Sequence, residues 1–143
     1  MVSDLPIKCV STVMDSKLHE KKCIPCEGGT KPLSPTEIEK YLKEVNPSQS
    51  RAGPSLGRVK GWQVSKDHKI LSKNLHFLNF KQAWSMLNEI ADTAEYENHH
   101  PDLNLHNWNQ LEIKLSTHAI KGLSENDFIM AAKIDRLVEE NKE

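Results

Sequence analysis

The sequence predicts an α+β fold in which three helices pack on one face of a four-stranded antiparallel sheet. The chain has 143 residues, which suits a single domain of ordinary size. Helical and strand-like patterns follow one another in the order helix, two strands, helix, two strands, helix. Because the strands come in closely spaced pairs, they favour antiparallel hairpins with the helices together on one face.

The first predicted helix begins at Pro35. Ser34 and Glu37 have the spacing of a capping box, and proline is favoured at the first helical position. Apolar residues then recur at helical spacing for about three turns. Asn46-Pro47 ends the helix, because the residue before a proline disfavours helical geometry.

The chain before this helix shows no sustained apolar period. We therefore predict that residues 1–33 are an N-terminal extension, partly flexible, and that residues 34–143 form the domain. Residues 46–58 are rich in Ser, Pro and Gly, which is typical of a surface loop.

A strand pair is predicted after this loop. Residues 61–64 begin a strand, and residues 66–68 suit a turn. In the next strand the apolar side chains share one face, which predicts a hairpin with one buried side. These side chains are Leu71, Leu75 and Phe77.

The second helix has the strongest pattern in the chain. Asn79 is a suitable N-cap, and the helix should end near Glu97. Its apolar residues form a wide stripe that we predict to face the core. We place Trp84 in this core, together with Trp62 from the first strand. The stripe consists of Phe80, Ala83, Trp84, Leu87, Ile90, Ala91 and Ala94.

A second strand pair and a last helix complete the order. Residues 111–115 alternate strictly between apolar and polar side chains, and Gly122 opens the following turn. Ser124 and Asp127 repeat the capping pattern before a helix that continues to about Val138.

Composition argues against two classes of function. The net charge is −1, from 19 basic and 20 acidic residues, and no basic stripe is visible, so we predict no direct binding to nucleic acid. No apolar run approaches the roughly 20 residues of a membrane-spanning helix, so we predict no membrane association. Residues 1–23 lack the pattern of a secretory signal, and we expect a cytoplasmic protein.

The three cysteines all precede residue 27, and an odd number does not suggest a disulfide framework. Cys23 and Cys26 form a C-x-x-C pair that offers two ligands, whereas a structural zinc site needs four. Cys9 and His19, or a second subunit, could supply the others. A thioredoxin-like redox role would need a strand followed by a helix around the pair. We interpret this region as a reduced, partly flexible tail.

Three of the seven histidines stand at the ends of predicted elements. His99 and His100 follow the long helix and His118 ends the alternating strand, so the three can meet at one rim of the sheet. Glu95 lies four residues before His99, and Asp127 lies in the first turn of the last helix. Imidazoles titrate near neutral pH, which suits acid–base chemistry. The plainer interpretation is that the histidines are solvated and that Asp127 caps its helix.

A zinc site is the alternative for the same residues, because three imidazoles and a carboxylate can bind the ion. However, neighbouring residues of an extended segment point to opposite sides, so His99 and His100 are poorly placed to share one ion. The sequence also lacks the H-E-x-x-H pair of a metalloprotease helix. We therefore predict no metal.

The motif around these histidines is far more specific than any pair of them. It resembles the signature of the pterin-4a-carbinolamine dehydratases, and the similarity covers residues 34–140. The segment before it resembles an extension found in some members of that family. The resemblance rests on Glu95-x-x-x-His99-His100-Pro101, Trp108, the stretches 115–118 and 122–127, and Gly61-Trp62.

The resemblance implies an activity as well as the fold. The family removes water from 4a-hydroxytetrahydrobiopterin to give a quinonoid dihydropterin, a step in the recycling of tetrahydrobiopterin. The reaction needs an acid for the leaving hydroxyl and a base for a ring proton, and it needs no metal or other cofactor. Members are typically homodimers or homotetramers, so we expect the same here.

By the same resemblance, His99 and His118 are the acid–base pair, and His100 is a catalytic residue that mainly orients the pterin. Glu95 and Asp127 are expected to set the tautomer and basicity of the imidazoles, as an aspartate orients a catalytic histidine. The residues expected to bind the pterin are His100, Pro101, Trp62 and Thr117.

Two positions depart from the animal members of the family. Asn98 stands where an aspartate is frequent, which removes a charge beside the histidines. The interval from Pro101 to His118 is one residue longer, and the insertion falls in the loop before Trp108, where length is tolerated.

Two other functions remain compatible with this resemblance. Animal relatives also bind the dimerisation helices of a homeodomain transcription factor, so one alternative is an interaction protein with a helix-binding surface. The other is a role in a different pterin pathway that uses the same pocket. The complete set of histidines and carboxylates favours the enzyme.

Overall fold

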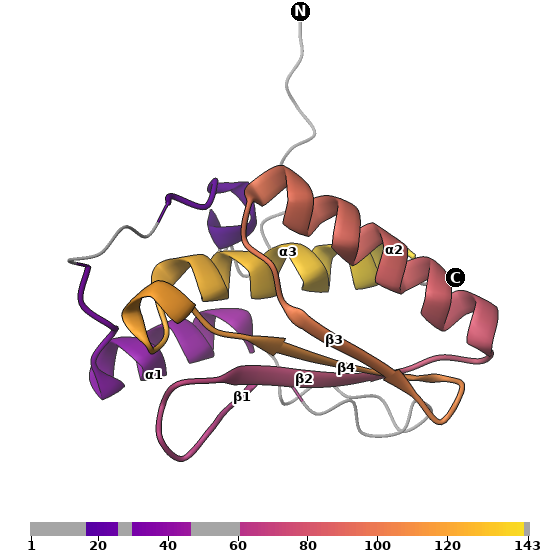
Figure 1. Ribbon diagram of the computed structural model, residues 1–143, viewed down its shortest axis with the longest axis horizontal. Coiled ribbons are helices and arrows are strands. Elements are labelled where there is room, and N and C mark those ends of the chain that lie inside the picture. Colours follow the sequence, from indigo (N-terminus) through magenta and orange to yellow (C-terminus); the bar gives the residue numbers. More distant parts are fainter. Residues whose placement is uncertain (1–16, 26–29, 47–60, 142–143) are drawn as a thin grey trace, which may run out of the picture.

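The computed structural model describes residues 17–25, 30–46 and 61–141 (Figure 1). It confirms the predicted order of three helices and four strands in an α+β domain. The predicted loop lies outside the described residues from position 47 onward, as do Cys9 and Cys26. The elements are η2 (Lys17–Glu20), α1 (Pro35–Val45), β1 (Gln63–Val64), β2 (Leu71–His76), α2 (Phe80–Glu97), β3 (Asp102–His106), β4 (Gln110–Leu115), η3 (His118–Ile120) and α3 (Glu125–Glu140).

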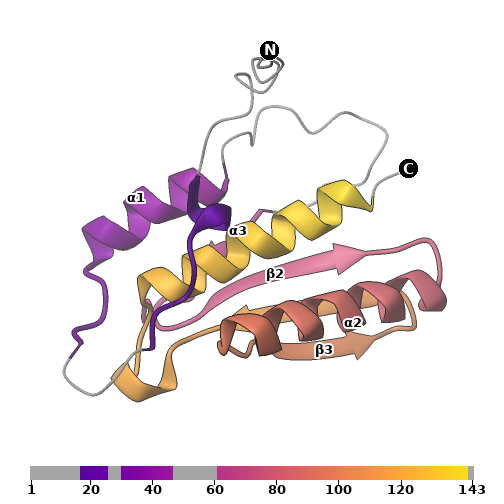
Figure 2. The same cartoon turned by 90° about the horizontal axis from the view of Figure 1, so that it is seen from above.

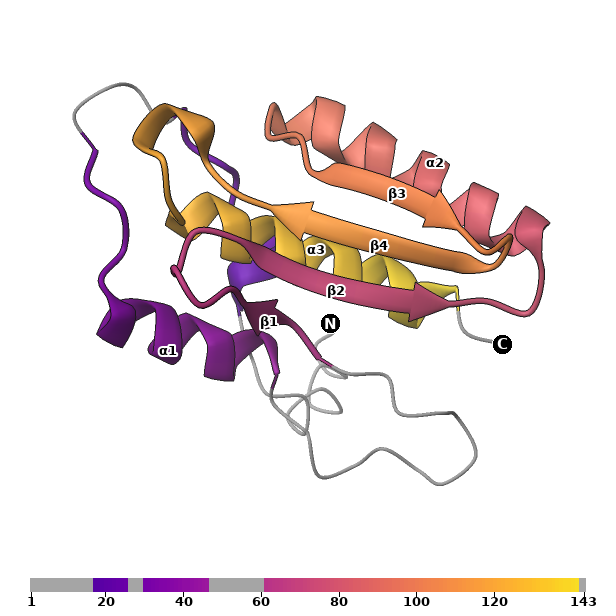
Figure 3. The ribbon, with the colours of Figure 1, turned by 60° about the horizontal axis from the view of Figure 1, so that its bottom comes forward.

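The four strands form one antiparallel sheet in the order β1-β2-β4-β3 (Figure 3). Each predicted hairpin is present, β1 with β2 and β3 with β4. The two hairpins join through β2 and β4, which pair over their full length from Leu71↔Leu115 to His76↔Gln110. As a result, β2 and β4 are the central strands of the sheet.

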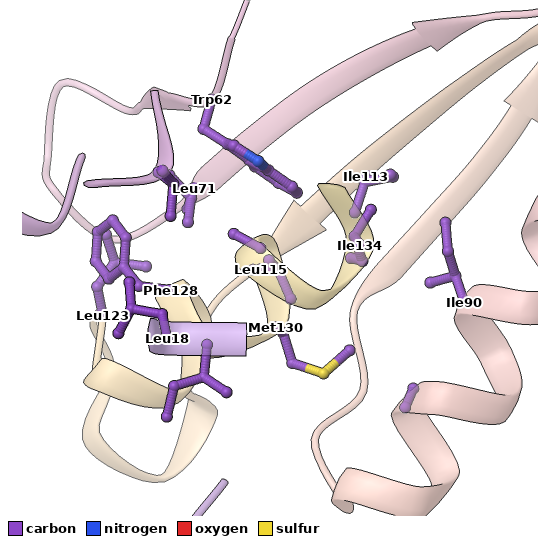
Figure 4. Close-up of a cluster of buried hydrophobic side chains, with 14 of the residues drawn as sticks. Leu18, Trp62, Leu71, Ile90, Ile113, Leu115, Leu123, Phe128, Met130 and Ile134 are labelled. Atoms are coloured by element: carbon purple, nitrogen blue, oxygen red, sulfur yellow. The ribbon is translucent and has the colours of Figure 1, made fainter. Parts of the chain in front are cut away.

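All three helices lie on the same face of the sheet, as predicted (Figure 2). The core fills the space between them. In β4 the side chains of Leu111, Ile113 and Leu115 are fully buried against the helices. Trp62 and Phe128 are the largest of the buried side chains (Figure 4). Burial of these apolar surfaces is the main force that holds helices and sheet together.

Each helix begins at its predicted cap. Ser34 and Glu37 form the capping box of α1, and the side chain of Asn79 accepts a hydrogen bond from the backbone of Gln82 at the start of α2. Helix α2 ends at Glu97. Its C-cap is Asn98, whose φ of 54° lies in the left-handed region. Asparagine adopts this conformation more readily than most residues, which accounts for a non-glycine residue at the helix end.

The prediction for Trp62 is confirmed, but the prediction that Trp84 belongs to the core is wrong. Trp62 is 2% exposed, whereas Trp84 is 51% exposed and its ring stacks on Phe80 with centroids 6.2 Å apart. Helix α2 has an inner apolar stripe and an outer one. Phe80 and Trp84, both predicted to face the core, form the outer stripe, and each is 51% exposed. Apolar spacing alone does not distinguish a core from an exposed contact surface. The inner stripe consists of Ala83, Met86, Ile90 and Ala94.

The residues on either side of the 47–60 segment are tied together by a side chain. The amide of Asn46 donates to the carbonyl of Trp62 and accepts from its backbone N–H, at 2.9 and 2.8 Å. Gly61 leaves room for this amide, because a Cβ at that position would lie 2.3 Å from the Asn46 Oδ1. Asn46 and Trp62, which are described on the two sides of the segment, are thereby held next to one another.

Part of the N-terminal extension packs on the domain. Leu18 in η2 is 2% exposed and belongs to the hydrophobic core, beside Met130 and Phe128 in Figure 4. Cys23 is also buried. The boundary predicted at residue 34 stays a prediction, and residues 17–25 are in contact with the helices.

Candidate active site

The three predicted histidines lie at two junctions, His99 and His100 between α2 and β3, and His118 at the start of η3 just after β4. Asp102 at the start of β3 pairs with Lys114 near the end of β4. Because the two strands are antiparallel, the chain just before β3 and the chain just after β4 lie at the same end of the sheet. The segment from His99 to Pro101 and the segment from Thr117 to His118 are therefore neighbours.

His99 contacts the carboxylate of Asp127, with 2.7 Å between Nε2 and Oδ1. The imidazole side chain is 12% exposed and that of Asp127 is fully buried. The other carboxylate oxygen accepts from the Thr117 hydroxyl at 2.7 Å and from the Ser124 backbone N–H at 2.9 Å. A buried carboxylate needs such donors, and here both of its oxygens have them.

This contact determines which nitrogen of His99 is left for chemistry. An ionised carboxylate accepts hydrogen bonds and does not donate them, so Nε2 carries the hydrogen that faces Asp127. The Nδ1 lone pair is then available to accept a proton. The contact also holds the imidazole ring in one orientation, as in other carboxylate–histidine pairs.

Thr117 supports Asp127 from the other side of the site. Its side chain is buried, its hydroxyl donates to Asp127, and its oxygen lies 2.8 Å from the Ser124 hydroxyl. The next residue, His118, is exposed and begins η3. Asp127 therefore links His99 to the backbone that carries His118.

His100 makes a similar contact in a different environment. Its Nε2 lies 2.7 Å from the Oε1 of Glu95, and the two side chains are 56% and 80% exposed. Exposed ion pairs contribute little, because water screens them and the side chains lose freedom in forming them. Glu95 therefore constrains His100 weakly.

Trp62 is not at the surface of this site. Its ring is 2% exposed and packs in the core beside Leu71 (Figure 4), and its Nε1 donates to Asp135 at 2.9 Å. Such a ring has almost no surface with which to contact a ligand. Pro101, by contrast, is partly exposed between His100 and β3.

Two hollows are found elsewhere on the surface. One of about 450 Å³ is lined by polar side chains of the sheet, among them His76, His106 and Glu112. Another of about 310 Å³ lies between α1 and the β1–β2 turn. His99, His100 and His118 line neither hollow.

The sequence reasoning missed Glu97. This residue is 3% exposed, its Oε1 pairs with the Lys133 ammonium at 2.9 Å, and its Oε2 accepts from the Cys23 backbone N–H at 2.8 Å. Burial alone would raise the pKa of Glu97, but these two partners hold it below the ordinary value. Its position in the sequence could have indicated that it is buried. Glu97 continues the three- and four-residue spacing of the inner stripe after Ala94.

Within residues 17–25, 30–46 and 61–141, no group of three or more His, Cys, Asp or Glu residues is placed to hold a metal ion. Cys23 is a free thiol in this region. Burial, and then the nearby charge of Glu97, raise the pKa of Cys23 to about 12, so the thiol stays protonated at neutral pH.

In the described part of the chain, no helix combines the length and the hydropathy that crossing a membrane requires.

Sequence comparison identifies the family. The family model for pterin 4 alpha carbinolamine dehydratase matches residues 31–137. This chain belongs to that family. A relative from Alkaliphilus metalliredigens, provisionally named pterin-4-alpha-carbinolamine dehydratase, is 44% identical over 121 residues, which cover 85% of this chain and 96% of the relative. A relative from Rickettsia canadensis with the same provisional name is 45% identical over 119 residues, covering 82% and 94%.

The fold of this dehydratase-family chain also matches a solved structure. The crystal structure of a transcriptional coactivator/pterin dehydratase from Brucella melitensis superimposes with a TM-score of 0.60, covering 75% of this chain and 98% of that one. The two sequences are 23% identical, so this likeness shows the shared fold.

Proposed function

We propose that the chain is a dehydratase that converts 4a-hydroxytetrahydrobiopterin to quinonoid dihydropterin and water. The observation that carries this proposal is the contact between His99 and the buried Asp127 carboxylate. A carboxylate with both oxygens bonded gives the imidazole a defined tautomer and orientation. Membership of the dehydratase family supplies the substrate class.

The reaction requires two proton transfers. The bond between carbon 4a and its hydroxyl breaks as an acid protonates the oxygen, which leaves as water. A base removes the proton from the neighbouring ring nitrogen, and the freed electron pair forms the carbon–nitrogen double bond. His99 and His118 are the proposed acid–base pair, and each such transfer is typically worth 10²–10⁴-fold.

The other predicted residues take supporting roles in this proposal. His100, weakly constrained by Glu95, and the partly exposed Pro101 bind and orient the pterin. Thr117 acts through Asp127, because its hydroxyl already donates to that carboxylate. Trp62 supports the site from the core, because its ring is buried.

We further propose that the protein works as a homodimer or homotetramer in the cytoplasm, in tetrahydrobiopterin recycling. The outer stripe of α2 favours self-association, because Phe80 and Trp84 are each 51% exposed and stack on one another, and Leu78 before the helix is 82% exposed. Exposed apolar clusters of this kind mark contact surfaces. Sedimentation of the wild type and of Trp84→Glu tests this, with a smaller species expected for the variant. A monomeric wild type would contradict the assembly.

The activity is tested by following ultraviolet absorbance as chemically generated 4a-hydroxytetrahydropterin loses water. The spontaneous rate is subtracted, and the wild type is compared with His118→Ala and with the control His76→Ala, which alters an exposed histidine on β2. We expect His118→Ala to lose about 10²–10⁴-fold in rate, and His76→Ala to match the wild type. A wild-type rate equal to the spontaneous rate would refute the dehydratase.

A further inference from the structure

Residues 21–24 connect the two helix ends that carry the His99–Asp127 pair. The backbone N–H of Cys23 donates to Glu97 at the end of α2. The backbone N–H of Ile24 donates to the Asn126 side chain at the start of α3, at 3.0 Å, and the Asn126 amide donates back to the Ile24 carbonyl. One short stretch of backbone therefore bonds to both helices, and η2, which precedes it, packs on α3 (Figure 2).

These bonds are partly shielded from water. Cys23, Glu97 and Asn126 are each less than 10% exposed, whereas Ile24 is 70% exposed. Leu18 fixes the preceding turn in the core. The bond between Cys23 and Glu97 is buried and the two between Ile24 and Asn126 are partly buried, so water competes least for the first. We call residues 21–24, which bond to both helices, the clamp.

The clamp and the proposed catalytic pair both connect the end of α2 with the start of α3. His99 lies two residues after Glu97, and Asp127 lies one residue after Asn126. The 2.7 Å contact between His99 and Asp127 thus depends on how the end of α2 sits relative to the start of α3. The clamp holds these same two ends through its bonds to Glu97 and Asn126.

A contact between the middle of α2 and the C-terminal end of α3 provides a comparison. There the Asn141 amide donates to the Glu89 carboxylate at 2.9 Å, in an exposed position. This bond joins the same two helices, but it is far along both of them from His99 and Asp127. Its loss should leave the catalytic pair in place.

From this arrangement we infer that Glu97 and Asn126 are positioning residues, which act with the clamp to set the geometry of His99 and Asp127. The inference rests on the proposed dehydratase function for its catalytic consequence. Small misplacements of catalytic groups slow reactions strongly even when the substrate still binds. Loss of the clamp should therefore lower kcat more than it raises KM.

The test uses full-length variants. Asn126→Ala removes both bonds to Ile24, and Asn141→Ala makes the same chemical change at the control position. Glu97→Gln keeps nearly the same shape but loses the charge that pairs with Lys133, and it carries the test should Asn126→Ala fail to fold. We expect kcat to fall about tenfold in Asn126→Ala and in Glu97→Gln, which we call the clamp variants, with KM changed less than about threefold. We expect wild-type values of both constants for Asn141→Ala.

A second readout does not depend on turnover. The ¹⁵N spectrum of the His99 imidazole, assigned by comparison with His99→Gln, reports on the Nε2–Asp127 hydrogen bond. We expect this signal to shift in both clamp variants and to stay unchanged in Asn141→Ala. If the wild type lacks dehydratase activity, the proposed function fails, and the spectrum alone decides whether the clamp positions His99.

Any of three results would overturn the inference. An unchanged His99 signal in folded clamp variants would show that the clamp does not position the pair, whatever happens to kcat. In an active enzyme, a shifted signal with wild-type kcat, or an equal fall in kcat for Asn141→Ala, would show that the clamp has no specific catalytic role.

Discussion

The structure contains two histidine–carboxylate pairs with the same contact distance and opposite environments. The His99–Asp127 and His100–Glu95 pairs both have 2.7 Å between nitrogen and oxygen. In the first pair the side chains are 12% and 0% exposed, and in the second they are 56% and 80% exposed. The distance alone therefore does not distinguish a strongly constrained imidazole from a weakly constrained one.

The difference lies in what surrounds each carboxylate. Asp127 has no exposed surface and receives hydrogen bonds from Thr117 and Ser124 as well as contacting His99, so its position is fixed from three directions. Glu95 is an exposed residue of α2, and its carboxylate contacts His100. We expect substitutions at the buried pair to have large effects and substitutions at the exposed pair to have small ones.

The largest effect is expected for Asp127→Asn. The amide keeps the shape but brings hydrogen-bond donors toward Thr117 and Ser124, and an amide N–H that faces His99 favours the other imidazole tautomer. We expect kcat/KM for the 4a-hydroxypterin to fall by about 1,000-fold, measured after subtraction of the spontaneous rate. A fall of less than about tenfold would mean that burial of the carboxylate does not matter for catalysis.

Burial should also control the chemistry of a thiol at the same end of the molecule. Because the pKa of Cys23 is raised to about 12, the reactive thiolate should be scarce at pH 8. We expect iodoacetamide to modify Cys23 at least about 100-fold more slowly in the folded protein than in urea. Tandem mass spectrometry separates Cys23 from Cys26 in the same peptide. Equal rates in the two conditions would contradict the buried position.

A smaller effect is expected for the stability of Glu97→Gln. The pKa of Glu97 is lowered in the folded state, so its carboxylate stabilises the fold above the ordinary value of 4.5, and this contribution is lost as the pH falls through the folded-state pKa. We expect the variant to lose about 1–2 kcal/mol of unfolding free energy at pH 7. The difference from the wild type should shrink below pH 4.5, as measured by thermal unfolding.

The smallest effect is expected for Glu95→Gln, the same chemical change on the exposed face of α2. Because this carboxylate is well solvated, we expect kcat/KM to fall by no more than about threefold. Kinetics at low and high salt provide the check, since any electrostatic effect of Glu95 should decrease as salt is added. A loss as large as that of Asp127→Asn would show that the two pairs are equivalent after all.

The fold could largely be predicted because its signals are local. The caps Ser34 and Asn79 act within a few residues, and the alternation at 111–115 reports directly on which side chains face the helices. The pairing of β2 with β4 could not be predicted from such local signals. It is a non-local pairing that depends on how two complete hairpins pack, and the residue pattern of either hairpin alone does not specify it.

The site shows the same limit at the level of single residues. The sequence indicated that His99, His100 and His118 could meet, because they stand at element ends. It did not indicate that Asp127 pairs with His99, or that Glu95 pairs with His100. Those contacts depend on side-chain direction after the left-handed residue Asn98, which sequence spacing does not encode.

The contact between Asn46 and Trp62 has a consequence for how this chain tolerates sequence change. Any side chain at Gly61 would collide with the Asn46 amide, and a shorter residue at 46 would give up both hydrogen bonds to the Trp62 backbone. The two positions are therefore epistatic: a substitution at Gly61 is acceptable after Asn46 has changed, and costly before. Homologous sequences should accordingly show covariation between positions 46 and 61.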